Sequence, residues 1–376
     1  MILVLQKMDA QESFVTEKTI ASKDSFWVDS KNFSALPKVF QQGFVMLYSR
    51  EEPGGIYVLT TKGAEVWSIH SANTGFKVVR YTKNKTFLCI TGTKEQDAGF
   101  GNTILELSLH GDTLLYLKKG EADFRQAIHH EILVNAKNQL VTLTREEKII
   151  DLSSRGGLKN DTVIGDGIQV LDRNGKQVWK WSVFDKVDPL SDINILKTKK
   201  DWTHANCIAI DKDGHYLVSF YSTGQIWKIN ATTGNVLWKF GKNGDFKIPD
   251  YAVFAQAHGL HINDKGWLMF FDNGADKRIS RTLAFQLNKT SKTAEARINT
   301  WLPPPMFSDR MGSSYLVADT TLLVCIARHK TIALTNFNGN FLWQLQSNRI
   351  HSYRAEFIPK ETLQPYLPKL TYTATK

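Results

Sequence analysis

A short pattern recurs along the chain and constrains the fold more than any other feature of the sequence. A polar turn ends in glycine, and a tryptophan follows that glycine by four positions, as in residues 61–67. The pattern returns at residues 172–179, 232–238 and 336–343, and residues 110–115 form a weaker copy with leucine in the tryptophan position. Glycine accepts the positive φ that a tight hairpin turn needs. Each copy therefore predicts two antiparallel strands joined by a short turn.

The spacing of these copies predicts a ring of similar units. The interval between Gly234 and Gly339 is about twice the others, so we expect it to hold one further copy. Residues 282–287 would be the hairpin strand of that copy, and Trp301 would be its aromatic residue. Six strand-rich repeats of roughly 40–50 residues are typical of a β-propeller. We therefore predict an all-β fold, a six-bladed β-propeller.

The flanks and two excursions do not follow the repeat. We predict an N-terminal arm or extra strand at residues 1–40, the propeller at residues 41–350, and an irregular C-terminal tail at residues 351–376. Residues 186–200 and 241–253 interrupt the repeat, and we expect these two loops to cap one face of the central channel.

Charge and cysteine content narrow the possible partners. The net charge is +10, but the lysines are scattered, which indicates a solvated basic surface rather than a nucleic-acid-binding arm. Such a surface also attracts anionic substrates. The three cysteines, Cys89, Cys207 and Cys325, are odd in number and widely spaced, which is typical of neither a disulfide framework nor a zinc site. No stretch has the roughly 20 apolar residues that a membrane span needs.

Histidines occupy matching positions in three of the repeats. His130 precedes a turn at Asn138 by the interval that separates His258 from the turn at Gly266. His204 occupies a similar position in another repeat. The innermost strands of a propeller line a central channel, so equivalent positions of different blades converge there. The pattern predicts three imidazoles at the hub.

The motifs around these histidines resemble the bacterial arylsulfate sulfotransferase family. They are His-His-Glu at 129–131, Asp-Trp-Thr-His-Ala-Asn at 201–206, and Gln-Ala-His at 256–258, followed by Phe-Asp-Asn-Gly at 271–274 and Ser-Arg at 280–281. The likeness covers roughly residues 120–300. It implies a six-bladed propeller that moves a sulfuryl group from a phenolic sulfate ester to a phenolic acceptor by a ping-pong mechanism. The resemblance implies no cofactor and no 3′-phosphoadenosine 5′-phosphosulfate (PAPS) donor.

The resemblance also implies roles for single residues. His258 matches the nucleophile that becomes a sulfohistidine, and His130 and His204 match the catalytic histidines around the sulfuryl oxygens. Asn206 matches a nearby hydrogen-bond donor, and we expect Tyr221 and His129 at the substrate. Because strand neighbours alternate, His129 is also expected to face away from the channel.

One position departs from the family pattern. Tyr221 stands where the family commonly has an arginine. Either another cation, such as Arg328 or Arg281, replaces that charge, or the activity has changed.

Several alternatives remain open at this stage. The histidines could be buried structural residues or could bind a metal, although the proposed chemistry needs none. The protein could be a catalytically weak propeller that binds a sulfated or other anionic ligand, or a protein-interaction propeller. Residues 272–274 and Arg281 are expected to be architectural, as a turn and a buried ion pair.

Partners and location follow from the same reasoning. We expect small-molecule phenols and their sulfates as partners, no nucleic acid and no membrane span, with a homodimer as one option for the assembly. The family resemblance implies export to the periplasm, but residues 1–7 do not form a complete signal peptide, so a cytoplasmic location stays open.

Overall fold

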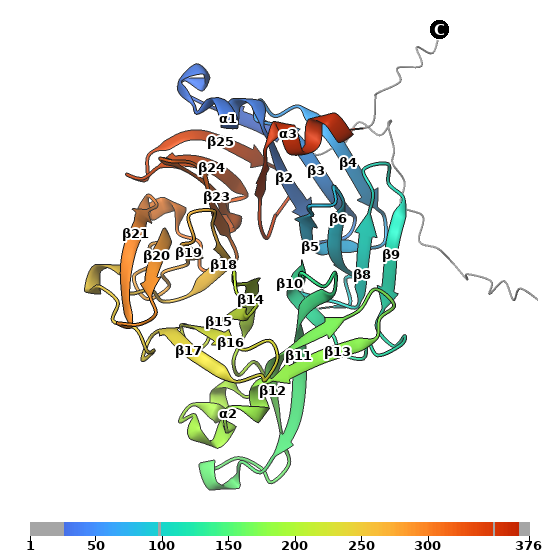
Figure 1. Cartoon of the computed structure of the whole chain (residues 1–376), viewed down its shortest axis with the longest axis vertical. Coiled ribbons are helices and arrows are strands. Elements are labelled where there is room, and N and C mark those ends of the chain that lie inside the picture. The colour runs from blue at the N-terminus through green and yellow to red at the C-terminus, as the bar shows by residue number, and fades with distance from the viewer. Residues whose placement is uncertain (1–25, 97–98, 349, 368–376) are drawn as a thin grey trace, which may run out of the picture.

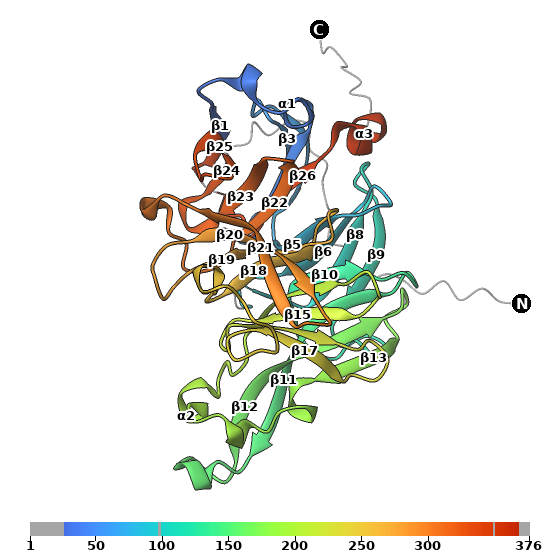
Figure 2. The same ribbon diagram turned by 60° about the vertical axis from the view of Figure 1, so that its left-hand side comes forward.

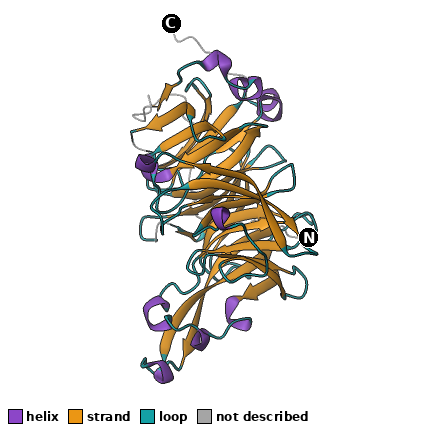
Figure 3. Ribbon diagram, turned by 90° about the vertical axis from the view of Figure 1, so that its left-hand side faces the viewer, coloured by secondary structure: helices purple, strands orange, loops and turns teal. Residues whose placement is uncertain are grey.

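The chain folds into a ring of six β-sheets (Figure 1). A computed structural model describes residues 26–96, 99–348 and 350–367. The six-bladed propeller predicted from the repeat is confirmed. Strands account for most of the regular structure, and the helices are short and lie at the periphery (Figure 3).

The first three blades contain the N-terminal half of the chain. Blade 1 consists of β26 (Glu356–Ile358), β2 (Phe44–Ser49), β3 (Gly54–Thr60) and β4 (Glu65–Ser71). Blade 2 consists of β5 (Gly75–Tyr81), β6 (Phe87–Gly92), β8 (Thr103–Leu107) and β9 (Thr113–Lys118). Blade 3 consists of β10 (Ile128–Val134), β11 (Leu140–Ile150), β12 (Asp161–Leu171) and β13 (Gln177–Ser182), and β7 (Phe100–Gly101) pairs with β10.

The remaining blades follow in chain order. Blade 4 consists of β14 (Ala205–Ile210), β15 (Tyr216–Phe220), β16 (Gln225–Ile229) and β17 (Val236–Gly241). Blade 5 consists of β18 (Ala257–Ile262), β19 (Leu268–Asp272), β20 (Arg281–Asn288) and β21 (Thr293–Trp301). Blade 6 consists of β22 (Ser313–Ala318), β23 (Thr321–Ile326), β24 (Thr331–Asn336) and β25 (Phe341–Ser347), and β1 (Phe26–Asp29) pairs with β25.

Short helices connect these strands. The described residues contain the α-helices α1 (Lys38–Gln42), α2 (Ile195–Thr198) and α3 (Lys360–Leu363). They also contain short 3₁₀ turns at Phe33–Ala35, Ser153–Arg155, Val183–Asp185, Pro189–Ser191, Asp250–Ala252, Pro304–Met306, Ala327–His329 and Gln364–Tyr366. No described helix is long and apolar enough to cross a membrane.

The two ends of the described chain meet in the ring. The tail predicted to be irregular contributes β26, which pairs with β2 and supplies the innermost strand of blade 1. That part of the prediction is wrong, because a strand of three residues carries too little periodicity to be recognised in sequence. Residues 1–25 of the predicted arm lie outside the described residues, and β1 forms the outer edge of blade 6. The predicted domain boundaries at residues 40 and 350 stay predictions.

The tryptophan of the repeat lies at a position that has an equivalent in every outer hairpin. Each hairpin has a bulge in its outer strand, and the residue just after the bulge is Trp67, Leu115, Trp179, Trp238, Ile298 or Trp343. The hidden sixth copy therefore exists in β20 and β21. However, the register gives its aromatic position to Ile298, and Trp301 lies at the end of β21.

Some of these tryptophans also join neighbouring blades. The indole Nε1 of Trp67 in blade 1 donates to the carbonyl of Leu109 at 2.8 Å, in the outer turn of blade 2. Trp343 of blade 6 donates to the carbonyl of Thr61 at 2.7 Å and so closes the ring onto blade 1. Trp343 is buried and packs edge-on against Phe40 of α1.

We expect Trp343→Phe to destabilise the protein by about 1–3 kcal/mol. The change leaves the buried Thr61 carbonyl without its donor and replaces the indole by a smaller aromatic group. Thermal unfolding followed by circular dichroism measures this effect. Trp27→Phe is the control, because Trp27 is exposed and its indole bonds only to the Gln346 side chain on the surface. Equal stability of Trp343→Phe and the wild type would contradict the role of Trp343 in ring closure.

The two loops at residues 186–200 and 241–253 do not cap the central channel as we expected. Residues 186–200 include α2 and lie beside the long hairpin of β11 and β12, which projects from the disc (Figure 2). Lys199 pairs with Asp161 at 2.5 Å in that contact. In residues 241–253, Phe246 packs against Trp238 of blade 4. Both loops cover blades rather than the hub.

Candidate functional site

A cavity of about 540 Å³ opens at the hub of the ring. Its wall includes all three histidines predicted to converge, His130, His204 and His258, together with Tyr221. The flanking parts of the chain also line it, with Arg50, Glu51, Gly99, Phe100, Asp309, Arg310, Met311, Arg328, His351 and Tyr353. A volume of this size accommodates a small aromatic molecule.

The innermost strands carry irregularities where the histidines lie. The pairing register shifts after His129 in β10, after Ala205 in β14 and after His258 in β18. His130 and His204 also adopt left-handed backbone conformations, with φ of 59° and 49°. Bulges re-aim side chains, and left-handed non-glycine residues cost free energy that the surrounding structure must offset. The local backbone is thus bent in three blades at the positions that face the cavity.

Five aromatic rings form a closed loop around the cavity. The centroid of His130 lies 5.8 Å from His204, and that of His204 lies 5.1 Å from Tyr221. Tyr221 lies 5.7 Å from His258, and His258 lies 6.2 Å from Tyr353. Tyr353 returns to His130 at 5.8 Å and closes the loop. Three imidazoles from blades 3, 4 and 5 are therefore close enough to act on one bound group.

Hydrogen bonds determine which nitrogen of His258 carries a proton. The Asn273 amide nitrogen donates to the carbonyls of Ser308 at 2.7 Å and Met311 at 3.0 Å. The Asn273 amide oxygen therefore points at His258, and its distance to Nδ1 is 2.5 Å. Since that oxygen only accepts, Nδ1 of His258 must donate, and Nε2 keeps its lone pair. Asn206 lies on the other side of the ring, with its amide nitrogen 3.2 Å from Nε2.

His258 is held neutral. Burial lowers its pKa to about 3, and the positive charges of His204, Arg354 and Arg50 act in the same direction. The hydrogen bond with Asn273 opposes the shift but does not overcome it. A buried, neutral imidazole with a fixed Nδ1 proton and an unprotonated Nε2 is a competent nucleophile.

His204 has the opposite character. Burial tends to lower its pKa, but the hydrogen bond and the negative charge of Asp201 raise it above the usual value. The Asp201 carboxylate lies 2.5 Å from Nδ1 of His204. His204 is thus suited to hold and release a proton near neutral pH.

His130 is backed by a second histidine and a carboxylate. Nδ1 of His130 lies 2.8 Å from Nδ1 of His129, and Nε2 of His129 lies 3.3 Å from Asp166. Burial, followed by the charges of His129 and His204, lowers the pKa of His130 well below its usual range. Because Nδ1 is engaged, Nε2 is the nitrogen of His130 that remains for a ligand.

The other predicted site residues lie at or behind the cavity wall. Tyr221 lines the cavity, and its hydroxyl donates to the carbonyl of Asp309 at 3.1 Å. Asn206 is fully buried behind Nε2 of His258. His129 lies behind His130 and is not part of the wall, so the expectation that it contacts the substrate does not match its position. The two neighbouring rings do not alternate across the strand, because the bulge after His129 brings their Nδ1 atoms within 2.8 Å.

The two cations considered as replacements for the family arginine differ in position. Arg328 lines the cavity, and its Nε lies 2.9 Å from the Asp309 carboxylate. Arg281 is buried away from the cavity wall and forms a 3.0 Å ion pair with Asp272. This structural role is the one that we expected for Arg281 and Asp272.

Several site residues escape prediction from the sequence. Asn273 lies in a motif that we interpreted as architectural, although its amide orients His258. Arg50, His351 and Tyr353 come from the flanks of the repeat. The signal that could identify Asn273 is its fixed spacing after His258, whereas the flanking residues carry no motif.

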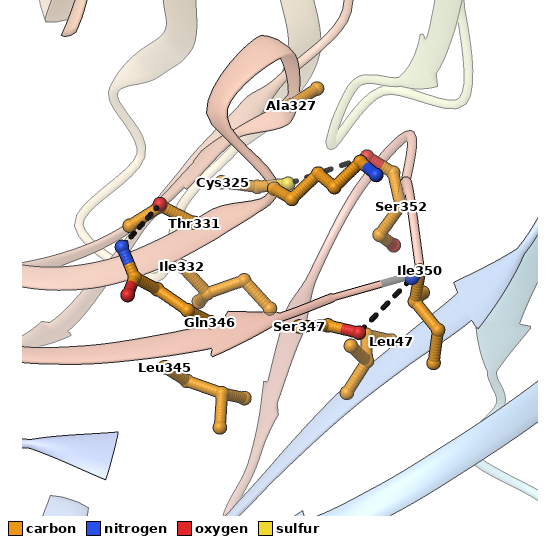
Figure 4. A pocket seen from close by; sticks show the side chains of 11 residues that line it. Leu47, Cys325, Ala327, Thr331, Ile332, Leu345, Gln346, Ser347, Ile350 and Ser352 are labelled. Carbon is orange, nitrogen blue, oxygen red and sulfur yellow. Dashed lines mark hydrogen bonds between the residues drawn. The ribbon is translucent and has the colours of Figure 1, made fainter. Parts of the chain in front are cut away.

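A second cavity is too small for a substrate. A small cavity of about 10 Å³ lies between blades 6 and 1, walled by Leu47, Cys325, Ile332 and Leu345 among others (Figure 4). It has room for about one water molecule and therefore for no substrate. Within the described ranges, no three His, Cys, Asp or Glu side chains are grouped as a metal site requires.

The fold and the site together define a β-propeller with a histidine-lined hub cavity. Comparison with known families gives this class a name, because the family Arylsulfotransferase (ASST) matches residues 30–302. The chain therefore belongs to the arylsulfotransferase family. A search of curated proteins gave no match.

Solved structures show likeness in fold alone. A protein of unknown function from Bacteroides caccae aligns with a TM-score of 0.52 and 10% identity, over 84% of this chain and 99% of its own. Virginiamycin B lyase from Staphylococcus aureus, an inactive variant solved with quinupristin, aligns with a TM-score of 0.41 and 12% identity, over 90% and 89%. The Cps50 (Swd1) β-propeller domain from Myceliophteria thermophila aligns with a TM-score of 0.44 and 11% identity, over 90% and 100%.

Proposed function

We propose that this arylsulfotransferase-family protein moves a sulfuryl group from a phenolic sulfate ester to a phenol, through a covalent intermediate on His258. The observation that carries the proposal is the pair of hydrogen bonds on His258. Asn273 holds the Nδ1 proton, so the Nε2 lone pair is directed to the side where Asn206 lies. Family membership supplies the reaction class, and this geometry supplies the nucleophile.

In the first half-reaction, Nε2 of His258 attacks the sulfur of the aryl sulfate. The S–N bond forms as the S–O bond to the phenol breaks, and the electron pair of that bond leaves on the phenolate oxygen. Protonated His204 gives its proton to this oxygen, so a neutral phenol departs. His258 then carries the SO₃ group, and its Nδ1–H stays bonded to Asn273.

In the second half-reaction, the acceptor phenol takes the place of the first. Its oxygen attacks the sulfur, the S–N bond breaks, and the electron pair returns to Nε2 of His258. Neutral His204 accepts the phenolic proton and returns to its starting state. Each half-reaction is the reverse of the other in form, as a ping-pong mechanism requires.

Groups around the ring stabilise the sulfuryl oxygens. Transfer spreads negative charge over three equatorial oxygens, as in phosphoryl transfer. The Asn206 amide nitrogen already lies beside Nε2 and is placed to donate to one oxygen. His130 stabilises a second sulfuryl oxygen through its Nε2. His129 and Asp166 maintain the orientation of the His130 ring.

The opposite pKa shifts of two histidines predict a broad pH profile for the first half-reaction. Below about pH 3, protonation removes the lone pair of His258. Because the pKa of His204 is raised, its acid form persists past the ordinary histidine range and is lost as pH rises through that higher pKa. We therefore expect an alkaline limb above the pKa of ordinary histidine. Stopped-flow phenol release from a sulfate with a poor leaving group measures the profile, and His204→Gln should remove the alkaline limb.

Steady-state kinetics test the proposed function directly. Initial rates are measured with a chromogenic aryl sulfate and a colourless phenol, and both concentrations are varied. A ping-pong mechanism gives parallel double-reciprocal lines, and phenol release depends on the acceptor after the first turnover. Absence of any phenol release across a panel of donors and acceptors would reject the proposal.

A second function is favoured by one observation. Tyr221 replaces the arginine common in the family, so a propeller that binds sulfated ligands with little turnover is the alternative. In that case calorimetry would detect binding of an aryl sulfate while phenol release stayed near the uncatalysed rate.

The biological setting rests on family membership alone. Phenols and aryl sulfates are the expected small-molecule partners, and no cofactor or metal is needed by the proposed steps. Export stays a prediction, because residues 1–25 lie outside the described residues. A homodimer also stays a prediction, to be tested by light scattering.

A further inference from the structure

The proposed transfer needs positive charge near the sulfuryl oxygens. Sulfuryl transfer benefits from a fixed cation near the oxygens, and Tyr221 removes the arginine that the family commonly places there. We propose that Arg50, from a different blade, supplies this positive charge to the sulfuryl group. This inference rests on the proposed function and assigns a further catalytic residue to the same site.

Arg50 and two of the three histidines lie around the same aromatic ring, that of Tyr353. Arg50 follows β2 of blade 1 and lines the hub cavity. Its guanidinium carbon lies 4.9 Å from the centre of the Tyr353 ring. The same ring lies 5.8 Å from His130 and 6.2 Å from His258. The cation and two of the three imidazoles therefore surround one side chain.

Tyr353 is itself fixed against the site. Its hydroxyl donates to the carbonyl of Asn206 at 2.9 Å, and Asn206 contacts Nε2 of His258. Nη1 of Arg50 lies 2.8 Å from the sulfur of Met311. Met311 also accepts from Asn273 through its carbonyl, at 3.0 Å. The residues that orient His258 thus also hold Arg50 in place.

Arg50 differs from Arg310 and Arg328 in burial. Its exposed fraction is 9%, whereas the side chains of Arg310 and Arg328 are 60% and 45% exposed. Arg310 and Arg328 share the Asp309 carboxylate, at 3.7 and 2.9 Å. Water and that carboxylate weaken their effect on a bound anion.

The electrostatics of the histidines agree with this placement. Burial is the main cause of the low pKa of both His130 and His258, and the positive charge of Arg50 contributes to the shift at each. A cation that acts on both imidazoles also acts on a sulfuryl group held between them. Guanidinium is suited to this role because its planar donors match two oxygens of a sulfate-like group.

The first test removes the charge. Arg50→Ala is expected to slow single-turnover phenol release from a chromogenic aryl sulfate by about 10²- to 10³-fold, the size typical of losing one transition-state donor. Arg50→Lys, which keeps a charge but not the planar geometry, should lose less. Arg328→Ala should also lose less, because Arg328 is exposed and already paired. Thermal melts of each variant separate a loss of rate from a loss of fold.

The second test moves the charge to the position that it occupies in the family. Tyr221→Arg added to Arg50→Ala is expected to restore transfer by about tenfold or more, since either position reaches the same oxygens. A structural defect at residue 50 would not be rescued by a cation at residue 221. In the otherwise wild-type protein, Tyr221→Arg should not raise the rate, because the cation is already present.

The outcomes separate this inference from the proposed function. No phenol release and no labelling of His258 in the wild type would reject the proposed function itself. An active wild type together with a fully active Arg50→Ala, or a larger loss in Arg328→Ala, would overturn the role of Arg50. If the Arg50 variants do not fold, a tenfold or greater gain from Tyr221→Arg alone would overturn it, and no gain would support it.

Discussion

His258→Ala should abolish sulfuryl transfer, with a fall in phenol release of about 10⁴-fold or more, because the change removes the proposed nucleophile of the first half-reaction, which is also the proposed carrier of the sulfuryl group. The cavity should still bind an aryl sulfate, since His130, His204 and Tyr221 remain in its wall. We therefore expect the turnover number to collapse while the dissociation constant for the donor changes little. Single-turnover kinetics and calorimetry measure the two quantities separately.

His261→Gln is a matched control for this variant. His261 lies three residues further along β18 and is bonded through Nδ1 to the carbonyl of Gly259 at 3.0 Å. Its ring packs against Tyr315 and not in the cavity wall. This variant should keep most of the transfer activity. If His258→Ala kept the activity as well, the nucleophile would have to be another group.

Glu131→Ala should be the most destabilising single change in the hub, at about 3–5 kcal/mol. Glu131 is fully buried, and its carboxylate lies 2.8 Å from Arg80 and 2.7 Å from Arg354. Arg354 is also fully buried, so removing Glu131 leaves an uncompensated charge in the interior. Urea unfolding followed by tryptophan fluorescence measures the loss.

The same carboxylate predicts an acid dependence of stability. Burial raises the pKa of Glu131, but the charges and hydrogen bonds of Arg354 and Arg80 outweigh burial and lower it. A lowered folded-state pKa gives stability that is present above the unfolded-state pKa and lost as pH falls through the folded value. The variant should therefore differ less from the wild type in acid than at neutral pH.

Glu147→Ala is the control for Glu131→Ala. Glu147 pairs with Arg145 at 3.0 Å, but its side chain is 55% exposed, so we expect a loss of less than about 1 kcal/mol. Equal effects of the two changes would contradict the assignment of Glu131 to a buried charge network.

The repeat predicts the fold because residues close together in sequence define each hairpin. A glycine with positive φ, followed by a bulge and a large apolar residue, defines the outer hairpins of five blades, as at Gly339 and Trp343, whereas Lys292 has the positive φ in blade 5. The hidden blade follows from spacing alone. The residue at its aromatic position does not, because Ile298 rather than Trp301 follows the bulge. The closing strand β26 escapes prediction because its partner β2 is more than 300 residues away in sequence.

The site is predicted in part for a similar reason. Equivalent blade positions converge at the hub, so matching offsets identify His130 and His258. The residues that set their chemistry come from elsewhere. Asn273 determines the tautomer of His258 through its own bonds to the loop at Ser308, and Tyr353 reaches the hub from the last described segment. Such contacts depend on three-dimensional packing that no local pattern encodes.

In the proposed reaction, Nε2 of His258 carries the sulfuryl group between donor and acceptor. The most direct measurement is peptide mass mapping after rapid mixing with an aryl sulfate in the absence of acceptor. We expect the added mass of one SO₃ group on the peptide that contains His258, and loss of that mass when a phenol is added. An adduct on a peptide without His258, or phenol transfer with no adduct at any time, would rule out His258 as the sulfuryl carrier.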